Sequence, residues 1–498
     1  MYDVVIVGGA LSGASVAILL LTEQPQLRIL IVEKTQAFSR RVGEATVEVS
    51  TYFLRHQLGL TSHLNHSHLV KNGLRFWFAN EKTKTLADCS EIGARYLSRL
   101  PAYLVDRAVL DEEVLRRALT LGAELWRPAA VRNITLEPGG IQRVTIKRGD
   151  LELLVETRWI VDASGVAAVL ARQENWLKPN LEHPTTAVWS RWSGVKDFDS
   201  PDLLRKYPEW SRECYGIRST ATNHLMGDGW WAWWIPLKSG DVSIGVVFDE
   251  RRLDWPKGGS LGDRLKSFLL QHPIGNELLA EAQWQEGDVH WRKHLPYYST
   301  TFVGDGFALV GDAAAFLDPF YSPGMDWISY TASSAAHLIL AQHHGEPTSP
   351  LIKRVNDDFT RSYSRWFDAI YRNKYDYMGE FDLLGLAFTM DVGLYYLGVA
   401  SQPFLRGPAA LREPYFATGP STPFYHWMRT YNRRFARMAQ VRRARGQLGR
   451  RNNRHRRMVK GFAFETSTIV TVLRAAGGWA RLELLEGWRS WFGRTKSP

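Results

Sequence analysis

Cysteine is scarce, since Cys89 and Cys214 are the only two in 498 residues. Two distant cysteines exclude a disulfide framework and lack the spacing of a zinc site, so the sequence predicts no bound metal and favours a reducing compartment. The first residues run directly into an apolar segment, without the basic stretch and cleavage site of a signal peptide. We therefore expect a cytoplasmic protein.

Long uninterrupted hydrophobic runs are also lacking. The longest, 383–400, contains Asp391 and three glycines and falls short of a membrane span. It predicts a buried or membrane-leaning helix. The chain is 45% hydrophobic, which is enough for a large core spread over about two or three structural units.

Acidic residues are missing from the segment 429–460, which holds thirteen of the cations of a chain whose net charge is +11. Such a segment is most often a solvated face or flexible arm. It could also dock an anionic phospholipid surface or an acidic partner protein. Nucleic acid is the weakest alternative, because no recognised binding module accompanies the charge, and we expect no nucleic-acid partner.

Tryptophan, by contrast, is abundant, with 20 in the chain and four of them in the eight residues 229–236. Tryptophan normally occupies cores and interfaces, where its N–H group still needs a partner. The cluster predicts either an aromatic strand in a core or the wall of a pocket.

The amino-terminal residues read as a strand, a glycine turn and a helix. Small residues in such a turn let the backbone approach a pyrophosphate at the helix N-terminus. A second strand, 28–32, ends in Glu33 at the distance expected for binding a ribose hydroxyl. The pattern predicts a dinucleotide site at Gly8, Ala10, Ser12, Gly13, Ala14 and Glu33.

Later segments agree with a flavoprotein of the glutathione-reductase type. Arg107 precedes an amphipathic helix, Val131 lies in a predicted strand, and Asp162 ends a strand that is followed by Ser164-Gly165. Gly311-Asp312 follows another strand, and in such proteins this aspartate holds the ribityl chain of FAD. We therefore predict FAD as the cofactor.

The order of these segments predicts an α/β fold in three parts. A glutathione-reductase-type FAD-binding domain covers 1–183 and 292–335, and an antiparallel substrate-domain sheet is inserted over 184–291. A mostly helical C-terminal region covers 336–498 and contains the basic segment 429–460.

Over about its first 335 residues the chain resembles the flavin-dependent halogenases. The resemblance rests on the Gly-x-Ala-x-x-Gly turn, on Gly43-Glu44-Ala45-Thr46, and on Trp231-x-Trp233-x-Ile235-Pro236, the most specific of the three. It implies that a separate flavin reductase supplies reduced FAD and that a halide ion is oxidised to hypohalous acid. Trp231 and Trp233 would separate flavin from substrate, and further FAD contacts would come from Gly43, Ala45, Pro319, Gly324 and Met325.

Lys71 matches the family's catalytic lysine in position. The chemistry needs either an ammonium that hydrogen-bonds hypohalous acid or an amine that forms a haloamine, held in a dry channel where the pKa can shift. The alternative is an ordinary surface lysine.

The loop 316–326 departs from the family pattern in two ways. Tyr321 stands where tryptophan halogenases carry a glutamate, which favours the phenol- and pyrrole-type enzymes. The resemblance also implies halide binding at Pro323 and Gly324, but proline has no N–H donor, which leaves Gly324 and the following amides. Asp326 is expected to cap the following helix or to act as an acid or base.

The sequence therefore predicts chlorination or bromination of an electron-rich phenol-like or pyrrole-like ring, free or tethered to a carrier protein. Carrier proteins are acidic, so the segment 429–460 is a candidate docking surface. An alternative is an FAD-dependent monooxygenase or dehydrogenase acting on an aromatic or polyene substrate. A third is a non-enzymatic, flavin-storing or membrane-associated scaffold.

Overall fold

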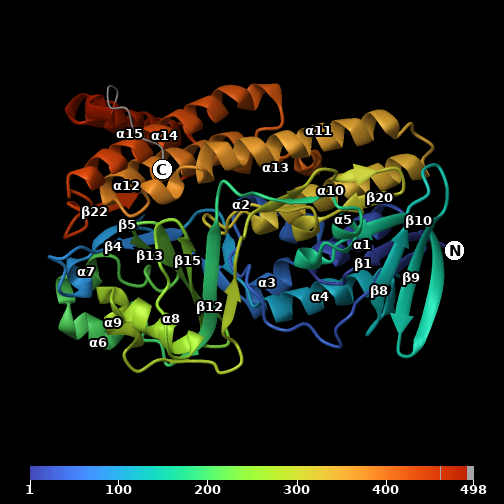
Figure 1. Ribbon diagram of the computed structural model, residues 1–498, viewed down its shortest axis with the longest axis horizontal. Helices are drawn as coiled ribbons and strands as arrows, with labels where there is room; N and C mark the ends of the chain where they lie inside the picture. The colour runs from blue at the N-terminus through green and yellow to red at the C-terminus, as the bar shows by residue number, and fades with distance from the viewer. Residues whose placement is uncertain (460, 491–498) are drawn as a thin grey trace.

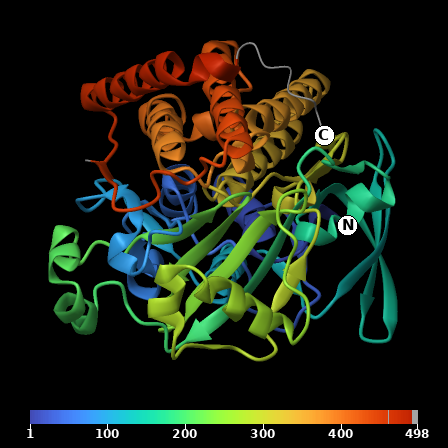
Figure 2. The same ribbon diagram turned by 60° about the vertical axis from the view of Figure 1, so that its left-hand side comes forward.

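A computed structural model describes residues 1–459 and 461–490 of the chain. Two β-sheets lie side by side beneath one layer of C-terminal helices (Figures 1 and 2). The predicted α/β fold is confirmed, while Lys460 and 491–498 of the predicted C-terminal region lie outside the described residues.

The first sheet is the dinucleotide-binding sheet, with strand order β19-β20-β10-β1-β2-β7. Its central strand β1 (Tyr2–Val7) pairs in parallel with β2 (Ile29–Val32) and β10 (Leu151–Asp162). The other members are β7 (Glu124–Trp126), β19 (Val303–Gly304), β20 (Phe307–Leu309) and the antiparallel strands β8 (Ala130–Thr135) and β9 (Gln142–Arg148). The strands β19 and β20 follow a long insertion, so this unit is discontinuous in the chain.

Helices α1 (Leu11–Glu23) and α4 (Arg107–Thr120) pack against this sheet and against each other. Residues 4–7 of β1, all of β2 and residues 159–161 of β10 are apolar and buried, as expected for parallel strands covered by helices on both faces.

The second sheet has the order β16-β12-β15-β14-β13-β4-β5-β22. It is mostly antiparallel, but β13–β4 and β5–β22 are parallel pairs. Its strands are β4 (Leu74–Phe78), β5 (Ser90–Ala94), β12 (Thr185–Ser193), β13 (Thr222–Gly227), β14 (Trp230–Pro236), β15 (Val242–Asp249), β16 (Gln283–Trp284), β22 (Arg456–Val459) and β17 (His290–Arg292), which pairs with β12 beside this path. The predicted limits 184–291 are therefore too narrow for this sheet, because β4, β5 and β22 come from outside them.

The upper layer contains α10 (Gly324–His343), α11 (Ser349–Trp366), α12 (Phe381–Tyr395), α13 (Ser401–Arg406), α14 (Thr422–Ala444) and α15 (Thr466–Leu485) (Figure 1). Among the described residues, one helical run, Phe381–Arg406, is long and apolar enough to cross a membrane. Of its apolar window, 72% is buried inside the protein, so it packs here as an interior helix.

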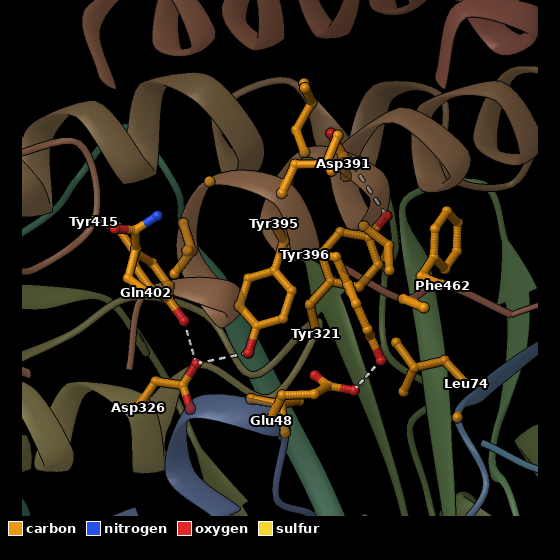
Figure 3. A pocket seen from close by; sticks show the side chains of 18 of the residues that line it. Glu48, Leu74, Tyr321, Asp326, Asp391, Tyr395, Tyr396, Gln402, Tyr415 and Phe462 are labelled. Atoms are coloured by element: carbon orange, nitrogen blue, oxygen red, sulfur yellow. Dashed lines mark hydrogen bonds between the residues drawn. The ribbon is translucent and has the colours of Figure 1, made fainter. Parts of the chain in front are cut away.

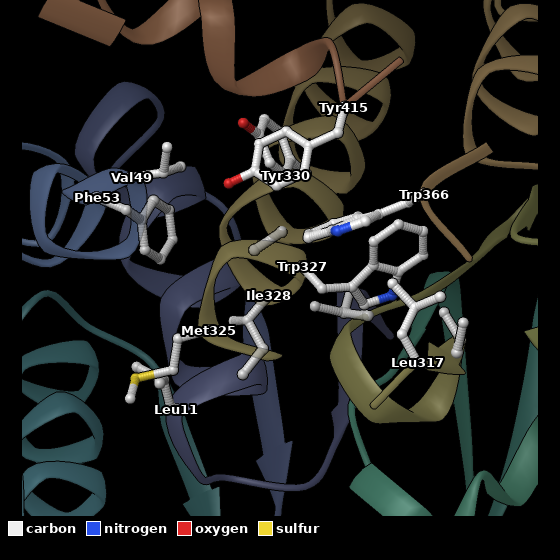
Figure 4. Packing of buried hydrophobic residues seen from close by; sticks show 14 of the residues in the cluster. Leu11, Val49, Phe53, Leu317, Met325, Trp327, Ile328, Tyr330, Trp366 and Tyr415 are labelled. Carbon is white, nitrogen blue, oxygen red and sulfur yellow. The ribbon is translucent and has the colours of Figure 1, made fainter. Parts of the chain in front are cut away.

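Helix α10 connects the dinucleotide-binding unit to the upper layer. Its residues Met325, Trp327, Ile328 and Tyr330 belong to one buried cluster with Leu11 of α1 and with Tyr415 (Figure 4). The loop that precedes α10 is thereby held between the flavin motifs and the helices above them.

Over its described residues 429–459, the basic segment is not a free arm, which corrects one expectation from its composition. Part of it is a solvated face, since the side chains of Arg450, Arg451 and Arg454 are 38%, 49% and 74% exposed. It forms α14, a loop and β22, and Arg442 within it is 1% exposed and pairs with Glu380 (2.6 Å), Asp382 (2.7 Å) and Glu486. Further ion pairs are Arg429–Asp368, Arg434–Glu483, Arg443–Asp228, Arg450–Glu486, Arg451–Asp382, Arg454–Asp88 and Arg456–Glu213. Counting charges within the segment gave the wrong expectation, because the carboxylates that neutralise its arginines come from distant parts of the chain.

Candidate active site

The glycine turn between β1 and α1 leaves room for a ligand's phosphates. Gly8 has φ +102°, and a Cβ there would lie 2.5 Å from the carbonyl oxygen of Ala163. A Cβ at Gly13 would lie 2.0 Å from the carbonyl oxygen of Gly8. Ala10, the N-cap of α1, makes no side-chain cap, and of the first amides of the helix Leu11 N donates to Asp111 Oδ1 (3.3 Å), so the following amides are the ones left for an anion. Ala14 is buried one turn into the same helix.

The two halves of the predicted flavin site meet at Gly311. Its φ is +62°, and a Cβ there would lie 2.7 Å from Ser12 Oγ at the start of α1. The neighbouring Asp312 makes no ion pair within 4 Å in the described part of the chain, and burial raises the pKa of its carboxyl group while Arg292, Arg107 and Arg41 oppose the shift. The carboxyl group of Asp312 therefore lies near three arginines without forming an ion pair with any of them.

Two predicted cofactor residues are engaged in their own loops. Both oxygens of Asp162 accept backbone hydrogen bonds, from Ser164 N (3.0 Å) and Leu170 N (2.8 Å), so we assign Asp162 to its loop rather than to the cofactor. Glu33 accepts from Gly9 N (2.9 Å) and from Thr35 N (2.9 Å), which fixes it beside the glycine turn. Its ribose contact stays a prediction.

The remaining predicted cofactor residues come from several other segments. A Cβ at Gly43 would lie 2.8 Å from Arg107 Nη1, and Ala45 forms a β-bridge with Leu104. Val131 is half-buried in β8 and pairs with Ile146. Pro319, Gly324 and Met325 come from the loop before α10 and its first turn.

The loop before α10 contains two consecutive residues in the left-handed backbone conformation. Tyr321 (φ +69°) and Ser322 (φ +59°) both adopt the left-handed conformation, and Pro323 is the N-cap of α10. No Cβ contact would arise within 4 Å of Gly324, so the helix N-terminus faces open space there. Pro323 contributes no donor to a halide, and the amides from Gly324 onward are those left to bind one.

Lys71 lies at the end of β3 (Leu69–Lys71), on the wall of a cavity of about 1210 Å³. It is only 2% exposed, so it is not a surface lysine. Its Nζ donates a hydrogen bond to the carbonyl oxygen of Thr46 (2.8 Å). Burial lowers the pKa of the ammonium to about 8, and the carboxylates of Glu48 and Asp326 oppose this shift.

Tyrosines and several carboxylates, among them Glu48, Asp326 and Asp391, line the same cavity (Figure 3). Asp326 accepts hydrogen bonds from Ser50 N (2.8 Å) and from the hydroxyls of Tyr415 and Tyr395. It therefore caps α2 (Glu48–Tyr52) and not its own helix, contrary to the expectation from sequence. Burial raises the pKa of Asp326 to about 7, and the hydrogen bonds from Tyr415 and Ser50 oppose the shift.

A buried polar cluster that sequence reasoning missed holds Tyr321. The Tyr321 hydroxyl donates to Asp391 Oδ2 (3.2 Å), and the same carboxylate pairs with Lys374 (2.7 Å). Lys374 also donates to Tyr377 and to Asn432, both at 2.8 Å. In the sequence, Asp391 is visible only as an interruption of an apolar run.

The tryptophans of β14 point to opposite faces of the second sheet, as strand geometry requires. Trp231 and Trp233 face the core shared with the flavin motifs, whereas Trp234 belongs to a separate apolar cluster. Neither Trp231 nor Trp233 lines the cavity that contains Lys71. The ring centroids of Trp231 and Phe320 lie 5.2 Å apart, and the role of the two tryptophans as a partition stays a prediction.

A hydrogen-bonded relay joins this row to the loop. Trp231 Nε1 donates to the Tyr375 hydroxyl (2.7 Å), and Tyr375 donates to Asp318 Oδ2 (3.0 Å). Asp318 also contacts His183 (2.9 Å) and accepts from Phe320 N (2.9 Å). Sequence spacing gives no signal for these contacts, because the partners are far apart in the chain.

The arrangement agrees with a match to the family model described as tryptophan halogenase, which covers residues 3–98 and 79–376. The chain belongs to the tryptophan halogenase family. The glycine cradle, the helix N-terminus that has no side-chain cap from Ala10, and Asp312 fit FAD, the cofactor of the flavin-dependent halogenases that the chain resembles.

Relatives within this halogenase family are similar over much of the chain. Flavin-dependent halogenase chlA of Dictyostelium discoideum is 30% identical over 66% of this chain and 58% of its own length. Flavin-dependent halogenase armH3 of Armillaria mellea is 26% identical over 70% of this chain and 68% of its own length. The chain thus spans less than two thirds of chlA.

The crystal structure of the halogenase PltM in complex with phloroglucinol and FAD has the same fold. It superposes with a TM-score of 0.73 at 18% identity, over 97% of this chain and 98% of PltM. The similarity therefore includes the helical layer that follows the region matched by the family model.

Proposed function

We propose that the chain is an FADH2-dependent halogenase that chlorinates or brominates an electron-rich, phenol-like ring. The observation that carries the proposal is the buried ammonium of Lys71 on the wall of a tyrosine-lined cavity. Tyr321, which replaces the glutamate of tryptophan halogenases, supports a phenol over free tryptophan. The phloroglucinol bound to PltM supports the same class of substrate.

The chemistry that bound reduced FAD would supply is the oxidation of halide, in which FADH2, O2, X⁻ and one proton give FAD, HOX and water. Lys71 then donates a hydrogen bond to the oxygen of HOX and makes the halogen a better electrophile. The X–O bond breaks as a C–X bond forms on the ring. The ring proton and the released hydroxide leave as water.

The residues of this chain that would hold FAD are Gly8, Ala10, Ser12, Gly13, Gly311 and Asp312. We also propose a separate flavin reductase as a partner, because the sequence shows no second nucleotide-binding motif. We propose a cytoplasmic location and a substrate that enters free in solution. The ion pairs of the segment 429–460 argue against that segment as the docking surface for a carrier protein.

The test combines purified protein, FAD, a flavin reductase, NADH, oxygen and bromide with simple phenols, and products are identified by mass. Brominated phenol is the expected product, and Lys71→Ala should abolish it while flavin oxidation continues. A second candidate, a flavin monooxygenase, is favoured by one observation: Pro323 removes a donor from the halide site. Product that is hydroxylated but never brominated would establish that candidate instead.

A further inference from the structure

The glutamate that tryptophan halogenases carry on the loop before α10 is absent here, yet a free carboxylate faces the same cavity. It comes from Glu48, the first residue of α2. We propose that Glu48 is the residue that recognises the substrate's hydroxyl group, by accepting its hydrogen bond and so holding the ring toward Lys71. This inference deepens the proposed function and rests on it.

The backbone of one segment places Glu48 and Lys71 on the same wall. Lys71 Nζ is fixed to the carbonyl oxygen of Thr46, and Glu48 follows two residues later. Both side chains line the cavity. Their electrostatic coupling agrees with this placement, since the carboxylate of Glu48 opposes the fall in the pKa of Lys71 that burial causes.

Glu48 has an unused acceptor. The Tyr396 hydroxyl donates to Oε1 and fixes the carboxylate, while Oε2 accepts no hydrogen bond from the described residues (Figure 3). Asp326 also lines the cavity, but its two oxygens already accept from Ser50, Tyr415 and Tyr395. The other carboxylates of the cavity are already paired with cations: Asp391 with Lys374, Glu413 with Arg406 and Glu465 with Arg99. Among the described residues that line the cavity, Glu48 is therefore the carboxylate with capacity for a ligand's O–H group.

A hydrogen bond from a phenol to a carboxylate is charge-assisted and stronger than one between neutral groups. It also raises the electron density of the ring at the positions ortho and para to the hydroxyl, where an electrophile attacks. A site built to pair with a hydroxyl discriminates against an analogue that lacks one, because its buried polar group is left unpaired. Glu48 would therefore make the enzyme selective for free phenols over their ethers.

The experiment compares phloroglucinol with its trimethyl ether, both electron-rich rings that differ in O–H donors. For wild type, Glu48→Gln and Glu48→Ala, the kcat/KM of bromination is measured, together with the dissociation constant of each ring without flavin. Hypobromous acid is measured separately with a scavenging β-diketone. Glu465→Gln is the matched control, since Glu465 lines the same cavity but is exposed and paired with Arg99.

Wild type should prefer phloroglucinol. Glu48→Gln should lower kcat/KM for phloroglucinol and weaken its binding by about 10- to 100-fold, as expected for the loss of a hydrogen bond to a charged group. Bromination of the ether should fall much less than that of phloroglucinol, because any effect of Glu48 on Lys71 is shared by both rings and cancels in their ratio. The yield of hypobromous acid should stay close to that of wild type, and Glu465→Gln should match wild type. Tyr396→Phe, which frees Oε1, provides a second variant and should weaken phloroglucinol binding less than Glu48→Gln.

An unchanged ratio between the two rings in Glu48→Gln would overturn the role of Glu48. Failure of the proposed function would look different, because wild type would then form no hypobromous acid at all. In that case a preference for binding phloroglucinol that Glu48→Gln removes would still support hydroxyl recognition by Glu48.

Discussion

The ammonium of Lys71 donates a 2.8 Å hydrogen bond to the backbone carbonyl oxygen of Thr46. Burial lowers the pKa of this ammonium to about 8, and within the described part of the chain its hydrogen-bond acceptor is neutral and cancels none of the charge. The remaining two N–H groups of the ammonium are available to the cavity.

This relationship predicts the pH dependence of halogenation. The charged form of Lys71 predominates below pH 8, so kcat/KM for bromination should fall tenfold per unit as the pH rises well above about 8. The measurement is a pH–rate profile from pH 6 to 10 with phloroglucinol, together with the rate of flavin oxidation as the control. A rate that instead rises through pH 8 would mean that the neutral amine reacts, as a haloamine mechanism requires.

A second prediction concerns stability and Asp326. Its pKa is raised by burial from 3.8 to about 7, so the folded protein binds a proton more tightly than the unfolded chain does. The stability that Asp326 contributes is present below pH 4 and is lost as the pH rises toward 7, by up to about 4 kcal/mol at ~1.4 kcal/mol per pKa unit. Asp326→Asn cannot titrate at this position. The difference in free energy of unfolding between Asp326→Asn and wild type should therefore shift in favour of the variant as the pH rises from 5 to 8.

Thermal denaturation of both proteins at the two pH values measures this gain. Asp357→Asn is the control, because Asp357 is half-exposed in a surface ion pair. If the difference between Asp326→Asn and wild type were the same at pH 5 and pH 8, Asp326 would have an ordinary pKa in the folded protein.

A third prediction concerns the buried pair of Lys374 and Asp391 behind Tyr321. Removing one partner of a buried ion pair leaves an uncompensated charge and typically costs about 3–5 kcal/mol. Lys374→Met should therefore lower the free energy of unfolding by roughly that amount, measured in urea, and Lys374→Met with Asp391→Asn should recover much of it. Lys353→Met, at an exposed pair, should change little. Equal effects of the two single lysine variants would contradict the prediction.

These sites show what could be predicted from the sequence. The glycine turn, the Gly-Asp motif and Lys71 are local patterns, and the structure brings Ser12 and Gly311 together as the flavin motifs require. Hydrophobic periodicity likewise predicted the helical layer. Each of these depends on residues that are close in the chain or on a motif whose spacing is constrained by a ligand.

The polar contacts around the cavity could not be predicted, because each joins residues that are far apart in the chain. Lys374 meets Asp391, 17 residues further along the chain, and Asp318 meets His183 across a separation of 135 residues. The prediction of a flexible arm over 429–460 failed for the same reason, since Arg442 is neutralised by the carboxylates of Glu380 and Asp382. Composition counts charges but does not show which charges fold against each other.

The last prediction tests the meeting of the two flavin motifs. Gly311→Ala would place a methyl group 2.7 Å from Ser12 Oγ, in a backbone with φ +62°. Gly216→Ala is a matched control, because Gly216 has φ +75° and no atom within 4 Å of its Cβ position. Both variants carry the left-handed backbone penalty of about 1–2 kcal/mol.

Only Gly311→Ala should also displace α1 from Asp312. We expect it to weaken FAD binding at least tenfold in a fluorescence titration, while Gly216→Ala binds FAD like wild type at a similarly lowered melting temperature. Because the two alanines share the backbone strain, a difference in affinity isolates the contact between Ser12 and Gly311. Equal affinities would mean that the cofactor does not depend on the close packing of these two segments.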